Sequence, residues 1–239
     1  MKKIHLLILL LIAGITLGGF SSCRFNCVHG SGNVKSEDRK GGDFSRINIS
    51  GAFKVVIKQD SSMSVKITAD DNLLKYIKTE VSDGKLRIYT KRNICKSKEM
   101  LVNIGIRNLE ELKASGAVEV EGDGKIITSD LHLRLAGVTK ITMDLNAANV
   151  TTHGSGVTEL NLRGQATSHD IETSGSGKVH AFDFVVSKCD IQTSGMGHSE
   201  VNVLNTLNVH SSGASEVRYK GNPSVTNDKS GASSVEKVN

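Results

Sequence analysis

The chain of 239 residues has the length of one large domain or two small ones, and it contains one proline, no tryptophan and only 4% aromatic residues. Its core must therefore be built from Val, Ile, Leu and small residues, and a collagen-like or low-complexity chain is excluded. A formal net charge of only +5, without a dense run of Lys and Arg, argues against nucleic-acid binding, so no nucleic-acid partner is predicted.

Residues 1–22, MKKIHLLILLLIAGITLGGFSS, are predicted to be a signal peptide. A basic start precedes an apolar run at 4–17, which is too short to span a membrane comfortably, and small residues follow it. The stretch FSSC at 20–23 is similar to a bacterial lipoprotein processing site, although Phe20 stands where leucine is usual. We therefore predict that Cys23 is lipidated and anchors the protein to a membrane through acyl chains. The alternative is a plain secretory peptide with Cys23 as an ordinary thiol.

Residues 23–43 are polar and rich in glycine, and we predict that they carry the lipidated cysteine and a tether. The remaining cysteines, Cys27, Cys95 and Cys189, match no zinc-binding spacing, so neither a metal site nor a cofactor is predicted. Cys27 and Cys95 could form a disulfide in an oxidising envelope, but the sequence does not place them within reach of each other. Cys189 is expected to be a small core residue.

Residues 44–108 alternate polar and apolar side chains, which predicts a β-rich N-terminal region. Six segments separated by turn residues read as strands: FSRINIS (44–50), FKVVIKQ (53–59), SVKITA (64–69), YIKTEVS (76–82), KLRIYT (85–90) and LVNIGI (101–106). Asp83-Gly84 predicts a hairpin. DDNLLKYI at 70–77 is predicted to form a helical turn, with Asp70 or Asp71 as its N-cap.

From residue 109 to residue 239 a repeat of about 19 residues takes over. Its predicted turn glycines are Gly116, Gly137, Gly156, Gly175, Gly197, Gly213 and Gly231. Apolar residues recur at fixed positions before and after these glycines, Val225 and Val201 among them, and a charged column stands three positions after the glycines. Because strand side chains alternate between faces, the apolar columns point inward. One unit cannot bury its own apolar face, so the predicted fold is an all-β parallel β-helix with glycine at its corners.

A polar column stands three positions before the glycines and contains Arg134, His153, Glu172, Gln192 and His210. In adjacent coils such side chains would lie within about 5 Å of one another, close enough for a sugar or metal site, although Gln192 interrupts any set of metal ligands. We therefore treat this column as a candidate binding surface. The alternative is a solvated polar face.

Catalytic residues are not predicted, and we expect that the protein is not an enzyme. His169 and Cys189 share an inward column, from which neither side chain would reach a substrate. Four aspartates of the repeats are expected at unlike places that do not converge on a cleft: Asp144, Asp170, Asp183 and Asp190.

Three stretches resemble the DUF2807 family, the auto-transporter adhesin head GIN domain. They are FSRINISGAFKVVIKQD (44–60), TEVSDGKLRIYTKRN (79–93) and SGASEVRYKGNPSVTNDKSGASSVEKV (212–238), and the resemblance covers about residues 30–239. It implies a right-handed β-helix in a lipoprotein or secreted protein of a Bacteroidetes-type bacterium. It supplies no catalytic residues.

The sequence thus predicts an envelope lipoprotein anchored in the outer membrane, at its periplasmic face or at the cell surface. Its predicted role is to present a rigid polar surface to a protein or glycan, as an adhesin or as a structural module. A second reading is a polysaccharide-active β-helix enzyme, a lyase or hydrolase. A third, the binding of a lipid or small ligand, requires a hollow between the N-terminal strands and the repeats. The oligomeric state is not predicted.

Overall fold

The chain folds almost entirely into β-strands, as alternation of apolar and polar residues predicts. The computed structural model describes residues 27–39 and 41–238. The strands are β1 (Val28–His29), β2 (Val34–Arg39), β3 (Arg46–Gln59), β4 (Val65–Asp70), β5 (Ile77–Ser82), β6 (Lys85–Thr90), β7 (Ile94–Lys96), β8 (Met100–Ile106), β9 (Glu111–Lys220) and β10 (Ser224–Lys237). The predicted all-β class is therefore confirmed. Within the described residues, no helix has the length and apolar character needed to cross a membrane.

Local sequence accounts for the turns of the N-terminal region. β5 and β6 form an antiparallel hairpin, and Asp83 and Gly84 between them adopt positive φ angles of 51° and 68°, which confirms the predicted turn. The predicted helical turn is a single 3-10 turn, η1 (Leu74–Tyr76). Its N-cap is Leu73 rather than an aspartate. The Asp70 side chain instead accepts a hydrogen bond from the backbone N–H of Lys98, outside the turn.

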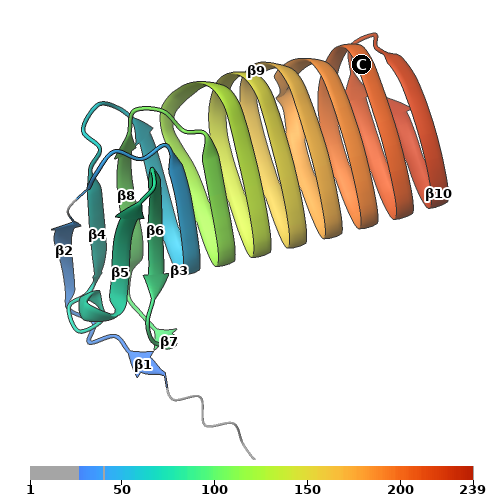
Figure 1. Ribbon diagram of the computed structural model, residues 1–239. Helices are drawn as coiled ribbons and strands as arrows, with labels where there is room; N and C mark the ends of the chain where they lie inside the picture. The colour runs from blue at the N-terminus through green and yellow to red at the C-terminus, as the bar shows by residue number, and fades with distance from the viewer. Residues whose placement is uncertain (1–26, 40, 239) are drawn as a thin grey trace, which may run out of the picture.

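Strand β3 joins the N-terminal region to the repeats. Its residues 46–50 pair in parallel with β6, and its residues 54–59 pair in parallel with β8. Along its other edge, residues 46–57 pair in parallel with the beginning of β9. β8 continues through antiparallel β4 to β2, so the N-terminal strands cover one end of β9 (Figure 1).

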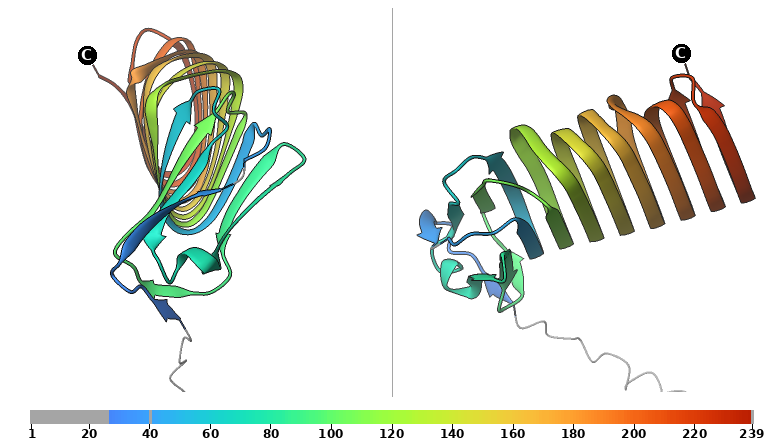
Figure 2. Two further views of the ribbon diagram at one scale, coloured as in Figure 1. Left: turned by 90° about the vertical axis from the view of Figure 1, so that its left-hand side faces the viewer. Right: turned by 45° about the horizontal axis from the view of Figure 1, so that its top comes forward.

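The ribbon of β9 winds in successive turns, which we call coils (Figure 1). Seen along the axis of winding, these coils superpose on one another (Figure 2). Residues 18 to 20 positions apart lie side by side: the side-chain amide of Asn202 donates to the carbonyl of Phe182, and β10 pairs in parallel with β9 at Ser224↔Thr206. Each coil therefore forms backbone hydrogen bonds with its neighbours rather than within itself.

The core lies inside the coils and is filled by columns of like residues. The positions six and four before the corner glycines are buried: Leu131, Leu133, Val150, Thr152, His169, Ile171, Cys189, Ile191, Leu207 and Val209. The columns after the corner are buried as well, from Val120 and Ile141 to Val217. Because strand side chains alternate between faces, the intervening positions are left for the outer surface.

The coil that contains β10 carries polar residues at some of its inward places. Asn227 of β10 is paired with Val209, and Lys237 is paired with Tyr219, so polar side chains replace apolar ones at these inward places. Val225, which we expected to be inward and buried, is 38% exposed because the described chain places no further coil over it.

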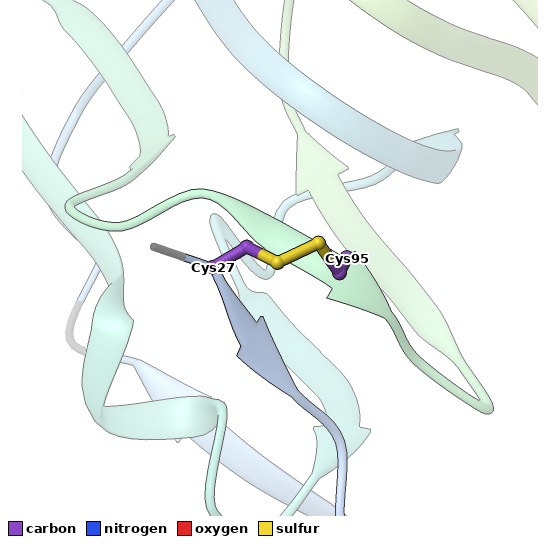
Figure 3. The surroundings of a disulfide bond; sticks show 2 residues. All are labelled: Cys27 and Cys95. Atoms are coloured by element: carbon purple, nitrogen blue, oxygen red, sulfur yellow. A yellow bond between two sulfur atoms is a disulfide. The ribbon is translucent and has the colours of Figure 1, made fainter. Parts of the chain in front are cut away.

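The predicted tether does not extend through residue 43. Residues 28–29 and 34–39 form strands that pair with β7 and β4, and Cys27 is bonded to Cys95 across a Cα–Cα distance of 5.5 Å (Figure 3). The sequence of β2, VKSEDR, is polar and charged like that of a linker. The reason is that β2 is an edge strand, where charged side chains discourage pairing with other chains. Cys23 and the signal peptide lie outside the described residues.

Candidate functional site

Each coil turns a corner at a glycine that stacks on the glycine of the preceding coil. A Cβ placed on Gly137 would lie 2.5 Å from the carbonyl oxygen of Gly116. The same relation links successive glycines with positive φ: Gly116, Gly137, Gly156, Gly175, Gly195, Gly213 and Gly231. The corner thus requires glycine for two reasons: its positive φ angle and the close approach of the neighbouring backbone.

One predicted corner glycine is wrong. Gly195, with φ +121°, continues the stack on Gly175, whereas Gly197 lies two residues beyond the corner. Ser199 consequently occupies the inward place predicted for Val201, which is buried two positions further along. The error arose because both glycines suit a turn locally, and only contact with the preceding coil distinguishes them.

The predicted polar column lies on the outer face, three residues before the corner. His153 Nδ1 and Glu172 Oε2 of adjacent coils are 2.8 Å apart. At the last coil, His210 Nδ1 is 3.7 Å from Asp228 Oδ2. Arg134 and Gln192 are exposed, and Arg134 Nε lies 3.5 Å from Glu111 Oε1.

This column lines two adjoining cavities on one face, which we call the serine groove. The first cavity, of about 290 Å³, is lined by Lys113, Arg134, Leu135, Ala136, His153, Gly154, Ser155, Glu172 and Ser174. The second, of about 440 Å³, is lined by Glu172, Thr173, Ser174, Gln192, Thr193, Ser194, His210, Ser211, Ser212, Asp228 and Ser230. Glu172 and Ser174 belong to both, so the groove runs across several coils. All five predicted surface residues line it, and the serines beside the corner glycines supply hydroxyl groups.

Charge is distributed unevenly along the serine groove. Lys113 and Arg134 stand toward the N-terminal region, and Glu172 and Asp228 stand further along the winding. The groove therefore offers guanidinium and ammonium donors at one end, and carboxylate acceptors in its middle and at its other end. Hydroxyl and amide groups between them can both donate and accept hydrogen bonds, which suits a ligand rich in polar groups.

The Ser155 hydroxyl beside His153 is not arranged as a nucleophile with its base. Glu172 orients His153 as a carboxylate would orient a general base, but the hydroxyl of Ser155 donates to the carbonyl oxygen of Leu135, at 3.4 Å. A hydroxyl nucleophile requires a hydrogen bond to the base instead.

His169 and Cys189 lie in the interior, as expected. His169 shares a hydrogen bond of 3.0 Å with Thr152, and its ring meets that of Phe184 edge to face, with 5.7 Å between centroids. Burial lowers the pKa of His169 to about 3 and raises the pKa of the Cys189 thiol. Neither group is ionised at neutral pH or open to a substrate.

Asp170 and Asp190 occupy equivalent positions in successive coils, which contradicts the expectation that the aspartates of the repeats lie at unlike positions. Both lie five residues before a corner glycine, once Gly195 replaces Gly197. Burial, and then the charge of Asp190, raise the pKa of Asp170. Asp190 also accepts a hydrogen bond from Asn208, at 2.6 Å. Neither aspartate lines the serine groove, so this pair does not turn the groove into an acidic cleft.

Sequence reasoning missed a second polar cluster, which lies after the corner. His180 Nδ1 is 2.9 Å from Glu200 Oε2, and His198 Nδ1 is 3.1 Å from Glu216 Oε2. Arg218 Nη1 lies 3.3 Å from Glu200 Oε1. Burial pushes the pKa of Glu200 up, but hydrogen bonds from the two histidines bring it below its ordinary value. The misplaced corner at Gly197 hid this cluster, because it put Glu200 in the column that His198 occupies.

The chain is similar to a known family and to solved structures over most of its length. A family model described as "Putative auto-transporter adhesin, head GIN domain" matches residues 43–223, and no curated protein matches the chain. A solved putative adhesin from Bacteroides fragilis NCTC 9343 is similar, with a TM-score of 0.83 and 19% identity, covering 88% of this chain and 100% of that one. From Parabacteroides distasonis ATCC 8503, a putative adhesin has a TM-score of 0.66 and 22% identity, covering 89% of this chain and 100% of its own. A putative lipid binding protein from the same organism has a TM-score of 0.67 and 21% identity, covering 89% of this chain and 99% of its own. These likenesses show a shared fold.

Proposed function

The chain belongs to the DUF2807 family, and from this membership and the serine groove we propose that it is a non-enzymatic binding protein of the cell envelope that holds a glycan. The observation that carries the proposal is the groove itself, a continuous polar surface on rigid coils. Hydroxyl, amide and charged side chains make up most of its lining. Its dense donors and acceptors suit a polyhydroxylated ligand.

We further propose that the fold is a right-handed parallel β-helix. The stacked corner glycines, the 18- to 20-residue spacing of side-chain contacts and the parallel pairing of β3, β9 and β10 support it. In such a fold each coil is held by its neighbours, so the groove residues keep their spacing without a ligand. A pre-organised groove costs less conformational entropy on binding.

The proposed anchor is a lipid on Cys23, and the disulfide supports a specific placement for it. Because Cys27 is bonded to Cys95, only residues 24–26 separate the proposed anchor from the folded region. Four residue steps span at most about 14 Å. We propose that the N-terminal strands lie next to the outer membrane and that the coils, with the groove, extend from them.

A second candidate function is the binding of a lipid or small apolar ligand. A cavity of about 490 Å³ lies where the N-terminal strands meet the first corner, and Ala52, Ile94 and Met100 contribute apolar side chains to it. The similar fold of a protein described as lipid binding also favours this candidate. Ile94→Asp should abolish binding of a fluorescent fatty acid if the cavity holds it, and should leave glycan binding unchanged.

The primary test is a glycan array probed with residues 24–239, run beside a depolymerisation assay on the same glycans. Saturable binding without cleavage is expected, weakened at least tenfold by Arg134→Ala or Glu172→Ala. The matched controls are Glu159→Ala and Lys178→Ala, which remove one negative and one positive charge at positions after the corner. They should change affinity less than twofold. Cleavage of a bound glycan would overturn the proposal in favour of a polysaccharide-active enzyme, and saturable binding only to proteins would overturn the choice of a glycan.

A further inference from the structure

Two cysteines and a histidine meet where β1 lies against β7. The sulfur atoms of Cys27 and Cys95 and a ring nitrogen of His29 all lie within 4.8 Å of one another. His29 belongs to β1, Cys27 directly precedes that strand, and Cys95 belongs to β7; Figure 3 shows the two cysteines. A structural disulfide accounts for the two cysteines, but it requires no imidazole beside them.

We propose that these three side chains form a redox-gated site for a soft divalent transition metal ion such as Zn²⁺. Two thiolates and one imidazole are a ligand set that zinc accepts, with a fourth position left for water. Neighbouring ligand atoms in a tetrahedral zinc site stand about 3.3 to 3.8 Å apart. The three atoms therefore need to move little, once the bond between the sulfurs is broken.

The gate is the disulfide bond. A dithiol reductant supplies two electrons and two protons, so that the Cys27–Cys95 bond breaks, two thiols form and the reductant becomes a disulfide. The metal ion then displaces the two thiol protons and forms two metal–sulfur bonds and one bond to the His29 nitrogen. Since the metal ligand is the thiolate, the oxidised protein cannot form this site.

The surrounding backbone holds the three residues together independently of the disulfide. The N–H of Gly30 donates to the carbonyl of Lys96, at 2.7 Å, directly after the histidine and the second cysteine. The buried carboxylate of Asp70 accepts hydrogen bonds from the backbone N–H groups of Gly32 and Lys98. These bonds tie the segments that follow β1 and β7 to the same carboxylate, so reduction should leave the ligands close.

The position of the cluster also allows a metal to enter. His29 and Cys95 are exposed and Cys27 is half-buried, and both cysteines line the cavity of about 490 Å³ at the first corner. The remaining thiol among the described residues, Cys189, is buried and protonated. It therefore serves as a matched control for thiol chemistry away from the site.

The test is a Co²⁺ titration of the full-length protein in detergent, before and after reduction with a phosphine under inert gas. The reduced protein should develop a thiolate-to-cobalt charge-transfer band and visible d–d bands that saturate at one ion per chain and disappear when Zn²⁺ is added. Cys95→Ser should abolish the bands, His29→Ala should weaken binding at least tenfold, and Cys189→Ala should leave it unchanged. Far-ultraviolet circular dichroism checks that each variant is folded.

Two results would overturn the assignment of these residues as metal ligands. One is a reduced protein without a charge-transfer band, although its thiols have been titrated as free. The other is equal affinity in the wild type and His29→Ala, which would show that the imidazole is not a ligand. Equal binding before and after reduction would refute the redox gate.

Discussion

Gly195 lies directly against Gly175 of the preceding coil, so that a Cβ on Gly195 would stand 2.5 Å from the Gly175 carbonyl oxygen. The contact is between two backbones, which cannot be moved as a flexible side chain can. It also fixes which residues of that coil face inward, and therefore where the serine groove runs.

Gly195→Ala should lower the free energy of unfolding by more than about 2 kcal/mol, because the alanine would combine a φ of +121° with a backbone clash. Gly122→Ala is the matched control, since its Cβ would meet no atom nearer than 3.6 Å, and it should change stability little. Chemical denaturation of both variants measures the difference. Equal stability of the two would show that the corner lies elsewhere.

Leu160→Asp should unfold the coils or cost more than about 4 kcal/mol, because Leu160 is only 1% exposed and a carboxylate there would be buried without a partner. Its neighbour Glu159 faces outward, where it pairs with Lys140 at 3.1 Å. Glu159→Ala should cost less than about 1 kcal/mol. Thermal unfolding distinguishes the two, and similar tolerance of both changes would contradict the assignment of faces.

The free energy of unfolding should decrease as the pH is lowered below about 6.5, because of His169. Its folded pKa of about 3 means that only the unfolded chain takes up a proton there as the pH falls from about 6.5 to about 3. The free energy of unfolding should therefore decrease by at most about 1.4 kcal/mol per pH unit from this residue, with no contribution above that window.

Denaturation between pH 7.5 and pH 5 checks this dependence. His169→Gln keeps a polar partner for Thr152 and should flatten the pH dependence, whereas His132→Gln, at an exposed histidine, should keep the slope of the wild type. A slope unaffected by His169→Gln would show that another group is responsible.

Cys23→Ala should release the protein from membrane fractions, because the variant lacks the sulfur to which the proposed lipid is attached. Fractionation of cells that express the wild type and the variant measures this, with Cys189→Ala as a control that keeps the anchor. Persistent membrane association of Cys23→Ala would contradict the lipoprotein proposal.

The sequence alone determined the all-β class, the turn at Asp83-Gly84 and most of the inward columns. These are local properties: side chains alternate every residue along a strand, and glycine recurs wherever a corner needs it. The same alternation placed Arg134, His153, Glu172, Gln192 and His210 outward, and the structure finds all five along one groove.

Only the tertiary structure decided between Gly195 and Gly197, joined Cys27 to Cys95, and brought His180 beside Glu200. Each of these depends on which residues of different coils or strands come into contact. A pattern along the chain allows several such contacts, and packing between backbones selects one. That is why strand faces were predictable here, whereas the exact register, the disulfide and the cavities were not.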